Sequence, residues 1–373
     1  MRLKNHPKIV KVTVLTFMLG ACSIQSSIND SVVKPFSMND AEETIGSIDI
    51  YDDKAYQYLD NETLVSVRGK GFDWVEGPVW VADGNYLLFS DIPKNLIRKF
   101  SIAHGNQIYL ENTGFSAPSA KGPGSNGLLI NQKNELVLLQ TGERQVSLMQ
   151  APLNQPKARF TNLVNNYHGM RLNGTNDGVF DQQGNLYFTD PAIGLDVVFK
   201  AGDNRQEKRL VEKQYKKPLT REKRVQQTPF AGVYRLSVHG ELILVDDTLT
   251  VPNGIALSPD DKTLYVSVSD KRAPAWFVYD VQDDGSLANR REFFNAQYLI
   301  GQPEQQGLPD GMAVHSSGVI FATGPGGVWL FSPEGEVLAK IKTGLATSNC
   351  TFTTDEKTLY ITADDNLLSI PIK

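Results

Sequence analysis

Six β-rich repeats constrain what this chain can fold into more than any other feature of its sequence. Each repeat opens on a polar residue, runs into a short apolar strand, turns at Gly or Asp, and returns through a second apolar strand that ends in small polar residues. The repeats start at Glu76, Asn126, Asn176, Asn253, Asp310 and Asn349. These starts lie 50, 50, 77, 57 and 39 residues apart, and no sustained helical period interrupts them.

Repeats of this kind predict an all-β fold, a six-bladed β-propeller in which each blade is a four-stranded sheet packed against its neighbours. Such a ring must be closed, and residues 63–67 and 367–372 are apolar enough to be strands of one composite blade. A pair of β-sandwiches is the alternative, although sandwiches do not require so regular a restart. We therefore expect one propeller domain over residues 61–373.

The N-terminus has the pattern of an export signal. Residues 1–21 carry four basic residues and no acid, followed by an apolar run too short to span a bilayer. The run ends in Leu19-Gly-Ala-Cys22, which looks like a bacterial lipobox. This predicts a lipoprotein signal peptide over residues 1–21 and lipidation at Cys22, and hence a protein anchored to a membrane on the periplasmic side of the bacterial cell envelope. An ordinary signal peptide with an incidental Cys is the alternative.

Charge and cysteine content exclude several classes of protein. The 37 basic and 42 acidic residues give a net charge of −5, and removal of the four basic residues of the signal leaves 33 against 42, or −9. An acidic chain offers no basic face to nucleic acid, so we expect no nucleic-acid partner. A hydrophobic content of 40% excludes a disordered chain, and two cysteines exclude a disulfide scaffold. Cys350 is expected to be a buried, inert thiol.

Two segments stand apart from the repeats. Residues 23–60 hold eight acids against two lysines without a sustained apolar period, so we interpret residues 22–60 as the acylated Cys and an acidic flexible tether. The long third interval contains a basic insertion, residues 196–228, with ten Lys or Arg against five acids. A solvated face is the plain interpretation of such a run. The alternative is a lid over one mouth of the ring.

We single out four of the six repeat starts because an oxygen-bearing side chain stands before a strand that begins with Gly, or one residue from it, namely Glu76, Asn176, Asn253 and Asp310. Because the first strand of each blade lines the central channel of a propeller, these side chains are expected to converge on its axis. Two carboxylates and two carboxamides form a hard, all-oxygen ligand set suited to Ca²⁺. Zn²⁺, Mn²⁺ or Mg²⁺ remain alternatives, and the same residues could instead be turn residues at the blade edges.

The repeats also carry motifs that resemble the SMP-30/gluconolactonase/regucalcin-like family of six-bladed propellers. The resemblance covers residues 76–372. Its motifs are Glu76-Gly-Pro-Val-Trp80, Arg171-Leu-Asn-Gly-Thr-Asn-Asp177, Tyr187-Phe-Thr-Asp-Pro191, Gly232-Val-Tyr-Arg235, Val251-Pro-Asn-Gly254, Gly307-Leu-Pro-Asp-Gly-Met312 and Phe321-Ala-Thr-Gly-Pro-Gly-Gly327. Each motif is weak alone, whereas the order and spacing are specific.

The resemblance implies a metal-dependent lactonase that converts a sugar lactone to an aldonic acid. Glu76, Asn253 and Asp310 would be metal ligands, with Asn176 as a fourth ligand or a substrate-binding amide. Asp310 would be the general base. Arg171 would bind the substrate, and Asn173 is an alternative to Asn176 as the substrate-binding amide. Departures from the family at Leu139-Gln-Thr-Gly142 and Pro191-Ala-Ile-Gly194 put the identity of the sugar in doubt.

Two other functions remain open at this point. One is an arylesterase or phosphotriesterase of the same fold. The other is a non-catalytic envelope propeller that is stabilised by Ca²⁺ and binds a ligand in its channel.

Overall fold

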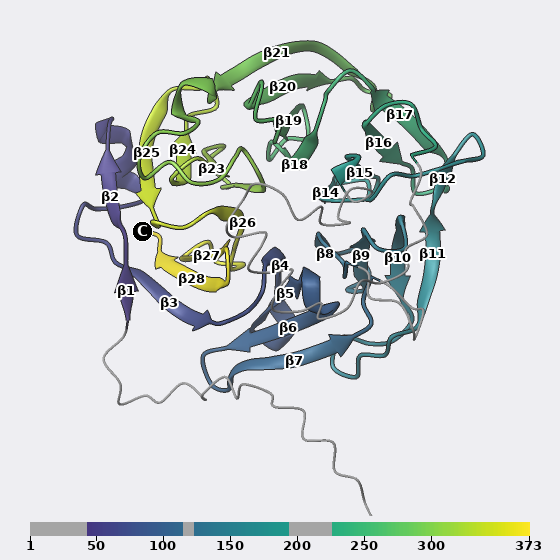
Figure 1. Cartoon of the computed structure of the whole chain (residues 1–373), viewed down its shortest axis with the longest axis horizontal. Coiled ribbons are helices and arrows are strands. Elements are labelled where there is room, and N and C mark those ends of the chain that lie inside the picture. Colours follow the sequence, from purple (N-terminus) through teal and green to yellow (C-terminus); the bar gives the residue numbers. More distant parts are fainter. Residues whose placement is uncertain (1–42, 115–122, 194–225) are drawn as a thin grey trace, which may run out of the picture. The chain divides into compact units, whose positions relative to one another are not determined.

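A computed structural model describes residues 43–114, 123–193 and 226–373, all within one compact unit, residues 33–373. Six antiparallel sheets surround a central axis (Figure 1). The blades in order are β4 (Val75–Val81), β5 (Tyr86–Asp91), β6 (Leu96–Ser101) and β7 (Gly105–Glu111); β8 (Leu128–Ile130), β9 (Leu136–Gln140), β10 (Gln145–Met149) and β11 (Phe160–Val164); β14 (Gly178–Phe180), β15 (Leu186–Asp190), β16 (Gly232–Leu236) and β17 (Leu242–Asp246); β18 (Pro252–Leu257), β19 (Thr263–Val268), β20 (Ala275–Val281) and β21 (Leu287–Asn295); β22 (Met312–Val314), β23 (Ile320–Gly324), β24 (Gly327–Phe331) and β25 (Val337–Lys342); and β26 (Thr347–Phe352), β27 (Thr358–Ala363), β28 (Asn366–Pro371) and β3 (Val65–Lys70).

The predicted six-bladed propeller is confirmed. The innermost strands β4, β8, β14, β18, β22 and β26 each begin within a few residues of a predicted repeat start, and each contacts the next around the axis, with β26 returning to β4. The middle strands are almost wholly buried because both of their faces pack against neighbouring blades. For example, Trp80 of the first blade stacks on Tyr360 of the sixth, with ring centroids 5.7 Å apart.

Buried hydroxyls near the ends of the second strands fasten neighbouring blades together. Ser90 donates to the carbonyl of Asn126 (2.7 Å), Thr189 to that of Asn253 (2.6 Å), and Thr323 to that of Ser348 (2.9 Å). Ser348 closes the ring by donating to the carbonyl of Val75 (2.7 Å). Each bond ties a backbone carbonyl at the start of one inner strand to a hydroxyl of the neighbouring blade. The small polar residues that end the repeats therefore have a structural role.

The ring closes as expected, through β3 paired antiparallel with β28 in the sixth blade. The expected tether, in contrast, is wrong for residues 43–60. Strand β1 (Thr44–Ile45) pairs with β3 and β2 (Ser47–Ile50) pairs with β25, so this N-terminal segment spans the outer edges of two blades. The 3₁₀ helix η1 (Asp53–Gln57) follows, and Ala55 and Leu59 are fully buried. Burial of these two apolar side chains holds the segment against the propeller, although the segment is acidic overall.

The remaining described elements are short connections. They are the 3₁₀ helices η2 (Ala82–Gly84), η3 (Ile92–Lys94) and η4 (Gln297–Leu299) and the hairpin of β12 (Asn166–Tyr167) with β13 (Met170–Arg171). Within the described ranges no helix is long and apolar enough to cross a bilayer. The predicted signal peptide, Cys22 and nearly all of the basic insertion lie outside the described residues.

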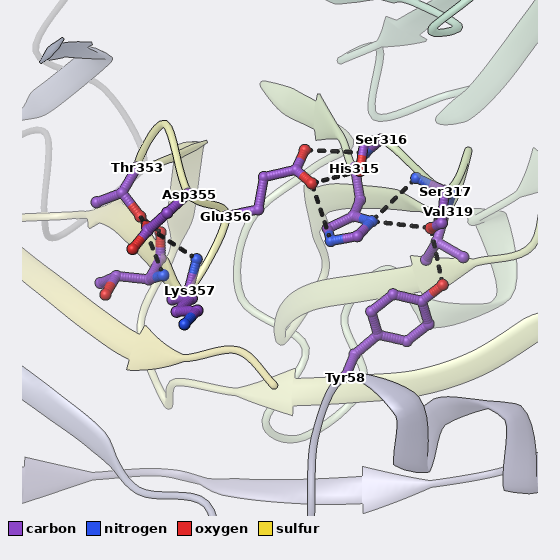
Figure 2. Close-up of polar contacts among 10 residues, drawn as sticks. Tyr58, His315, Ser316, Ser317, Val319, Thr353, Asp355, Glu356 and Lys357 are labelled. Atoms are coloured by element: carbon purple, nitrogen blue, oxygen red, sulfur yellow. Dashed lines mark hydrogen bonds and ion pairs between the residues drawn. The ribbon is translucent and has the colours of Figure 1, made fainter.

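A polar cluster joins the fifth and sixth blades and the N-terminal segment at the far ends of β22 and β26 (Figure 2). The Glu356 carboxylate accepts the Ser316 N–H (2.8 Å) and the Ser316 hydroxyl, and it pairs with His315 Nε2 at 3.2 Å. The Ser317 N–H donates to His315 Nδ1 (3.1 Å), while the Ser317 hydroxyl lies 2.7 Å from the Tyr58 hydroxyl. This cluster is referred to below as the clasp.

Candidate functional site

The starts of the inner strands form the candidate site, at the opposite end of the propeller from the clasp. Asp310 precedes β22 whereas His315 follows it, and Asn349 lies near the start of β26 whereas Glu356 follows its end. The Asn349 amide donates to Asp177 Oδ2 at 3.2 Å, although these residues belong to the sixth and third blades, which face each other across the axis. Side chains of the repeat starts therefore do converge at the centre of the ring.

Glycines at the repeat starts make room for this convergence. A Cβ atom on Gly311 would lie 2.0 Å from Asn349 Cγ, and one on Gly127 would lie 3.1 Å from Asp177 Oδ1. A Cβ on Gly254 would lie 2.1 Å from the Asp310 carbonyl oxygen. Glycine is thus needed here because the next blade approaches too closely for any side chain. The Asn-Gly and Asp-Gly pairs are more than turn residues.

Glu76, Asn253 and Asp310 lie at the starts of the inner strands β4, β18 and β22. Glu76 is 5% exposed and accepts the Gly77 N–H at 3.3 Å. Asn253 is buried and donates to the Ser269 hydroxyl at 2.8 Å, and its side chain also stabilises the Asp310 carboxylate. Asp310 Oδ1 is buried and has no hydrogen-bond partner among the described residues. A buried carboxylate oxygen without a partner is a costly feature that a ligand could relieve.

Asn176 lies beside this group but differs from the carboxylates in its exposure. Its side chain is half-buried, and its carbonyl oxygen accepts the Gly127 N–H at 2.8 Å. The backbone therefore holds the residue in place while the amide is left accessible at the site.

Two site residues, Asp177 and Asn349, were not among the predicted ligands. Asp177 is 9% exposed and accepts the Gly178 N–H at 2.9 Å. Its backbone carbonyl accepts from Thr189, as those of Gly127 and Gly311 accept from Leu139 and Thr323. Asp177 is therefore equivalent to the glycines of the other repeats. The sequence signal that could have identified Asp177 is the Asn-Asp-Gly triplet. In this triplet an acid stands at a position that is occupied by Gly in three other repeats, namely Gly127, Gly254 and Gly311.

The electrostatics of the three carboxylates are unfavourable in the absence of a cation. Burial, and then the charge of Asp177, raise the pKa of Glu76. Burial raises the pKa of Asp177 to about 6. Burial, followed by the charges of Glu76 and Asp177, raises the pKa of Asp310 well above its ordinary value. The folded protein therefore disfavours ionisation of each of these three carboxylates.

A divalent cation fits this arrangement. The donor set is all oxygen, as Ca²⁺ prefers, and it includes the unpartnered Asp310 oxygen. Over the described ranges, no group of three or more His, Cys, Asp or Glu side chains is arranged as a ready-made metal cluster. The set that fits therefore mixes carboxylates with the amides of Asn253 and Asn176.

Arg171 and Asn173 have contrasting environments. The Arg171 side chain is 46% exposed, and its guanidinium donates to the Glu143 carbonyl (2.7 Å) in the loop between β9 and β10, at the same end as the repeat starts. Asn173 is fully buried. Its amide donates to the carbonyls of Asp190 (3.1 Å) and Phe230 (2.9 Å), and its oxygen accepts from Thr228.

All polar atoms of the Asn173 side chain are thus engaged within the fold. This placement disagrees with the expectation that it binds substrate, because the amide would have to break three internal bonds to do so. Asn176 is the accessible amide of the two.

Comparisons with known proteins agree on the family and the fold. Residues 74–365 match the family model described as SMP-30/Gluconolactonase/LRE-like region. A gluconolactonase from Zymomonas mobilis is 35% identical over 336 residues, covering 88% of this chain and 87% of that protein. A lactonohydrolase from Aspergillus oryzae is 32% identical over 146 residues, covering 33% of this chain and 29% of that protein. The solved structure of a gluconolactonase from Xanthomonas campestris has a TM-score of 0.70 at 26% identity, covering 90% of this chain and 99% of that one.

Proposed function

The chain belongs to the SMP-30/gluconolactonase/LRE-like family and is a lactonase, and from this premise we propose that it hydrolyses a sugar lactone to an aldonic acid with a divalent metal at the repeat starts. The single observation that carries the metal requirement is the unpartnered, buried oxygen of Asp310 beside two further carboxylates. Glucono-1,5-lactone is the substrate that the relatives' names suggest first.

Glu76, Asn253 and Asp310 would hold the cation, with Asn176 as the fourth protein ligand or as an amide that binds the substrate. When bound, Ca²⁺ or another divalent ion would supply Lewis-acid stabilisation of the negative charge that develops on the lactone carbonyl oxygen. Asn253 is oriented for this role by its bond to Ser269, whose own hydroxyl donates to the Pro309 carbonyl (2.5 Å), next to Asp310.

Asp310 is the proposed general base. The Asp310 carboxylate, through the oxygen that does not face the cation, accepts a proton from water as the water oxygen bonds to the lactone carbonyl carbon. The bond between that carbon and the ring oxygen then breaks, and the ring oxygen takes up a proton to become a hydroxyl. One water is consumed, and the product is the aldonic acid, which ionises at neutral pH.

Arg171 is the proposed substrate-binding cation. Its exposed guanidinium is anchored on the Glu143 carbonyl, which orients it at the site end of the ring. In that position it can donate to the hydroxyls of the sugar ring or to the carboxylate of the product.

A titration of acid release tests this function. Glucono-1,5-lactone is added to the wild-type protein with and without a chelator, and to the Asp310→Asn variant. We expect loss of release with chelator and in the variant. Equal rates in all three would contradict the mechanism. Aryl acetates and a phosphotriester are measured alongside, and a clear preference for either would favour the esterase alternative.

We further propose that Cys22 carries the lipid anchor and that the domain acts on the periplasmic side of a bacterial membrane. The support is the sequence of residues 1–22 alone. Detergent partitioning of the wild type and of Cys22→Ser tests it, with release of the variant from the membrane fraction as the expected result.

A further inference from the structure

Asn349 has contacts that no other side chain at the site has. It lies at the start of β26 and is 6% exposed. Its amide donates across the axis to Asp177 Oδ2 at 3.2 Å, and it also stabilises the ionised form of Glu76. Its own oxygen accepts the Cys350 N–H at 2.8 Å, so the orientation of the amide is fixed, with the NH₂ group toward the carboxylates.

The position of Asn349 depends on its neighbour in the fifth blade. The side chain lies directly over Gly311, the residue after Asp310, at a distance that no Cβ atom could tolerate. One neutral amide is therefore packed among the three carboxylates of the site. It is a donor to the Asp177 carboxylate and stabilises that of Glu76, and it adds no charge of its own.

Asp177 depends on Asn349 more than the other two carboxylates do. Oδ1 of Asp177 is satisfied by the Gly178 N–H, and Oδ2 accepts from Asn349. Removal of the amide would leave Oδ2 buried next to the like charge of Glu76. The carboxylate would then lose one of the two hydrogen bonds that fix its orientation, and ligand groups that are no longer held in place bind a cation less tightly.

We propose that Asn349 is a positioning residue that holds the Asp177 and Glu76 carboxylates in one arrangement and thereby sets the affinity of the site for a divalent cation. This inference rests on the metal-dependent function proposed above. Asn349 touches neither the reacting atoms nor, by this account, the cation. It acts through the carboxylates on either side of it.

The matched variants are Asn349→Leu, which removes the donor at similar volume, and Asn349→Ser, which retains one donor. The control is Asn185→Leu. Asn185 is also a buried amide that donates to a carboxylate, Asp181 Oδ2 at 2.7 Å, but it lies in the turn between β14 and β15, away from the repeat starts.

The measurement is calorimetric titration of Ca²⁺ into the full-length, chelator-stripped proteins at one pH, with circular dichroism to confirm folding. A hydrogen bond to a charged group is worth enough that its loss should weaken Ca²⁺ binding by about tenfold or more in Asn349→Leu. Asn349→Ser should bind with intermediate affinity, and Asn185→Leu should match the wild type. At saturating Ca²⁺, kcat of Asn349→Leu should recover most of the wild-type value.

Wild-type affinity in Asn349→Leu would overturn the inference while leaving the proposed function intact. If Asn349→Leu does not fold, the test rests on the other two variants. Wild-type Ca²⁺ affinity in Asn349→Ser, together with weakened Ca²⁺ binding in Asn185→Leu, would then overturn the inference. If the wild type itself binds no Ca²⁺, the metal-dependent function fails and the inference fails with it.

Discussion

The carboxylates at the two ends of the propeller have opposite environments. At the clasp, Glu356 is partly exposed, accepts two hydrogen bonds from Ser316 and pairs with His315. At the site, Asp310 keeps a buried oxygen without a partner and Glu76, Asp177 and Asp310 oppose one another's ionisation. The clasp carboxylate is partnered within the protein, whereas the site keeps a buried carboxylate oxygen without a protein partner among the described residues.

This difference in hydrogen bonding separates polar clusters that stabilise the fold from polar clusters that belong to a functional site. Fully partnered groups stabilise and fasten elements together, while under-compensated ones store unfavourable electrostatics at a functional site. Variants at the two ends should therefore change different properties, and the following predictions test that division.

The largest expected effect is on catalysis at the site end. Asp310→Asn should lower kcat/KM for the lactone by about 10²–10⁴-fold, because a general base of this kind contributes that much. The metal-free variant should be at least as stable as the wild type, since it loses one of three opposed charges. Acid-release kinetics and thermal unfolding measure the two properties. If Asp310→Asn is active but less stable than the wild type, Asp310 has a structural role, like the residues of the clasp.

Binding of a cation at the candidate site should stabilise the folded protein against unfolding. Ca²⁺ at 100 times its dissociation constant should stabilise the wild type by about 2.7 kcal/mol, because it binds the folded state alone. Glu76→Gln should show a much smaller gain, because one ligand charge is removed. Thermal unfolding with and without Ca²⁺ provides the measurement. Equal Ca²⁺-dependent gains in both proteins would place the cation elsewhere.

Loss of charge at the clasp should affect stability alone. Glu356→Gln should destabilise the fold by about 1–3 kcal/mol, because hydrogen bonds to a charged group are weakened or lost. Lactone kcat/KM should stay at the wild-type value. Urea unfolding and acid-release kinetics check both expectations, and a fall in activity in the folded variant would show that the two ends are coupled.

The smallest effect concerns a buried cation, Lys340 on β25, which donates to Gln305 (2.6 Å) and lies over the Trp329 ring. Burial lowers the pKa of Lys340 to about 8. The unfolded chain therefore binds more protons than the folded one between about pH 8 and pH 10.5, and stability should rise with pH in that window. The rise should disappear in Lys340→Met. Unfolding free energies at pH 7.5, 9 and 10.5 test this, and identical slopes in both proteins would contradict it.

The repeats, their order and the closing strands were predictable because each blade restarts with the same local pattern. Glu76, Asn253 and Asp310 followed from that periodicity. Asp177 and Asn349 did not, because their position is occupied by Gly in three repeats and its importance emerges only when blades meet across the axis.

The packed segment over residues 43–60 was missed for a different reason. Its acids outnumber its basic residues, yet Ala55, Tyr58 and Leu59 are buried in the core, where the outer strands pack over them. The expectation that Asn173 binds substrate disagrees with the structure because a motif identifies a residue type but not the direction of its side chain. Its amide faces Asp190 and Phe230 inside the fold.

The most direct test of the cation site is a crystal grown with Ca²⁺ and a sugar lactone, with anomalous scattering recorded. An anomalous peak about 2.3–2.6 Å from Asp310 Oδ1, with oxygens of Glu76 and Asn253 in the same shell, is the predicted result. A Ca²⁺ peak at another position, with Asp310 Oδ1 bonded instead to a protein donor or to water alone, would contradict the account.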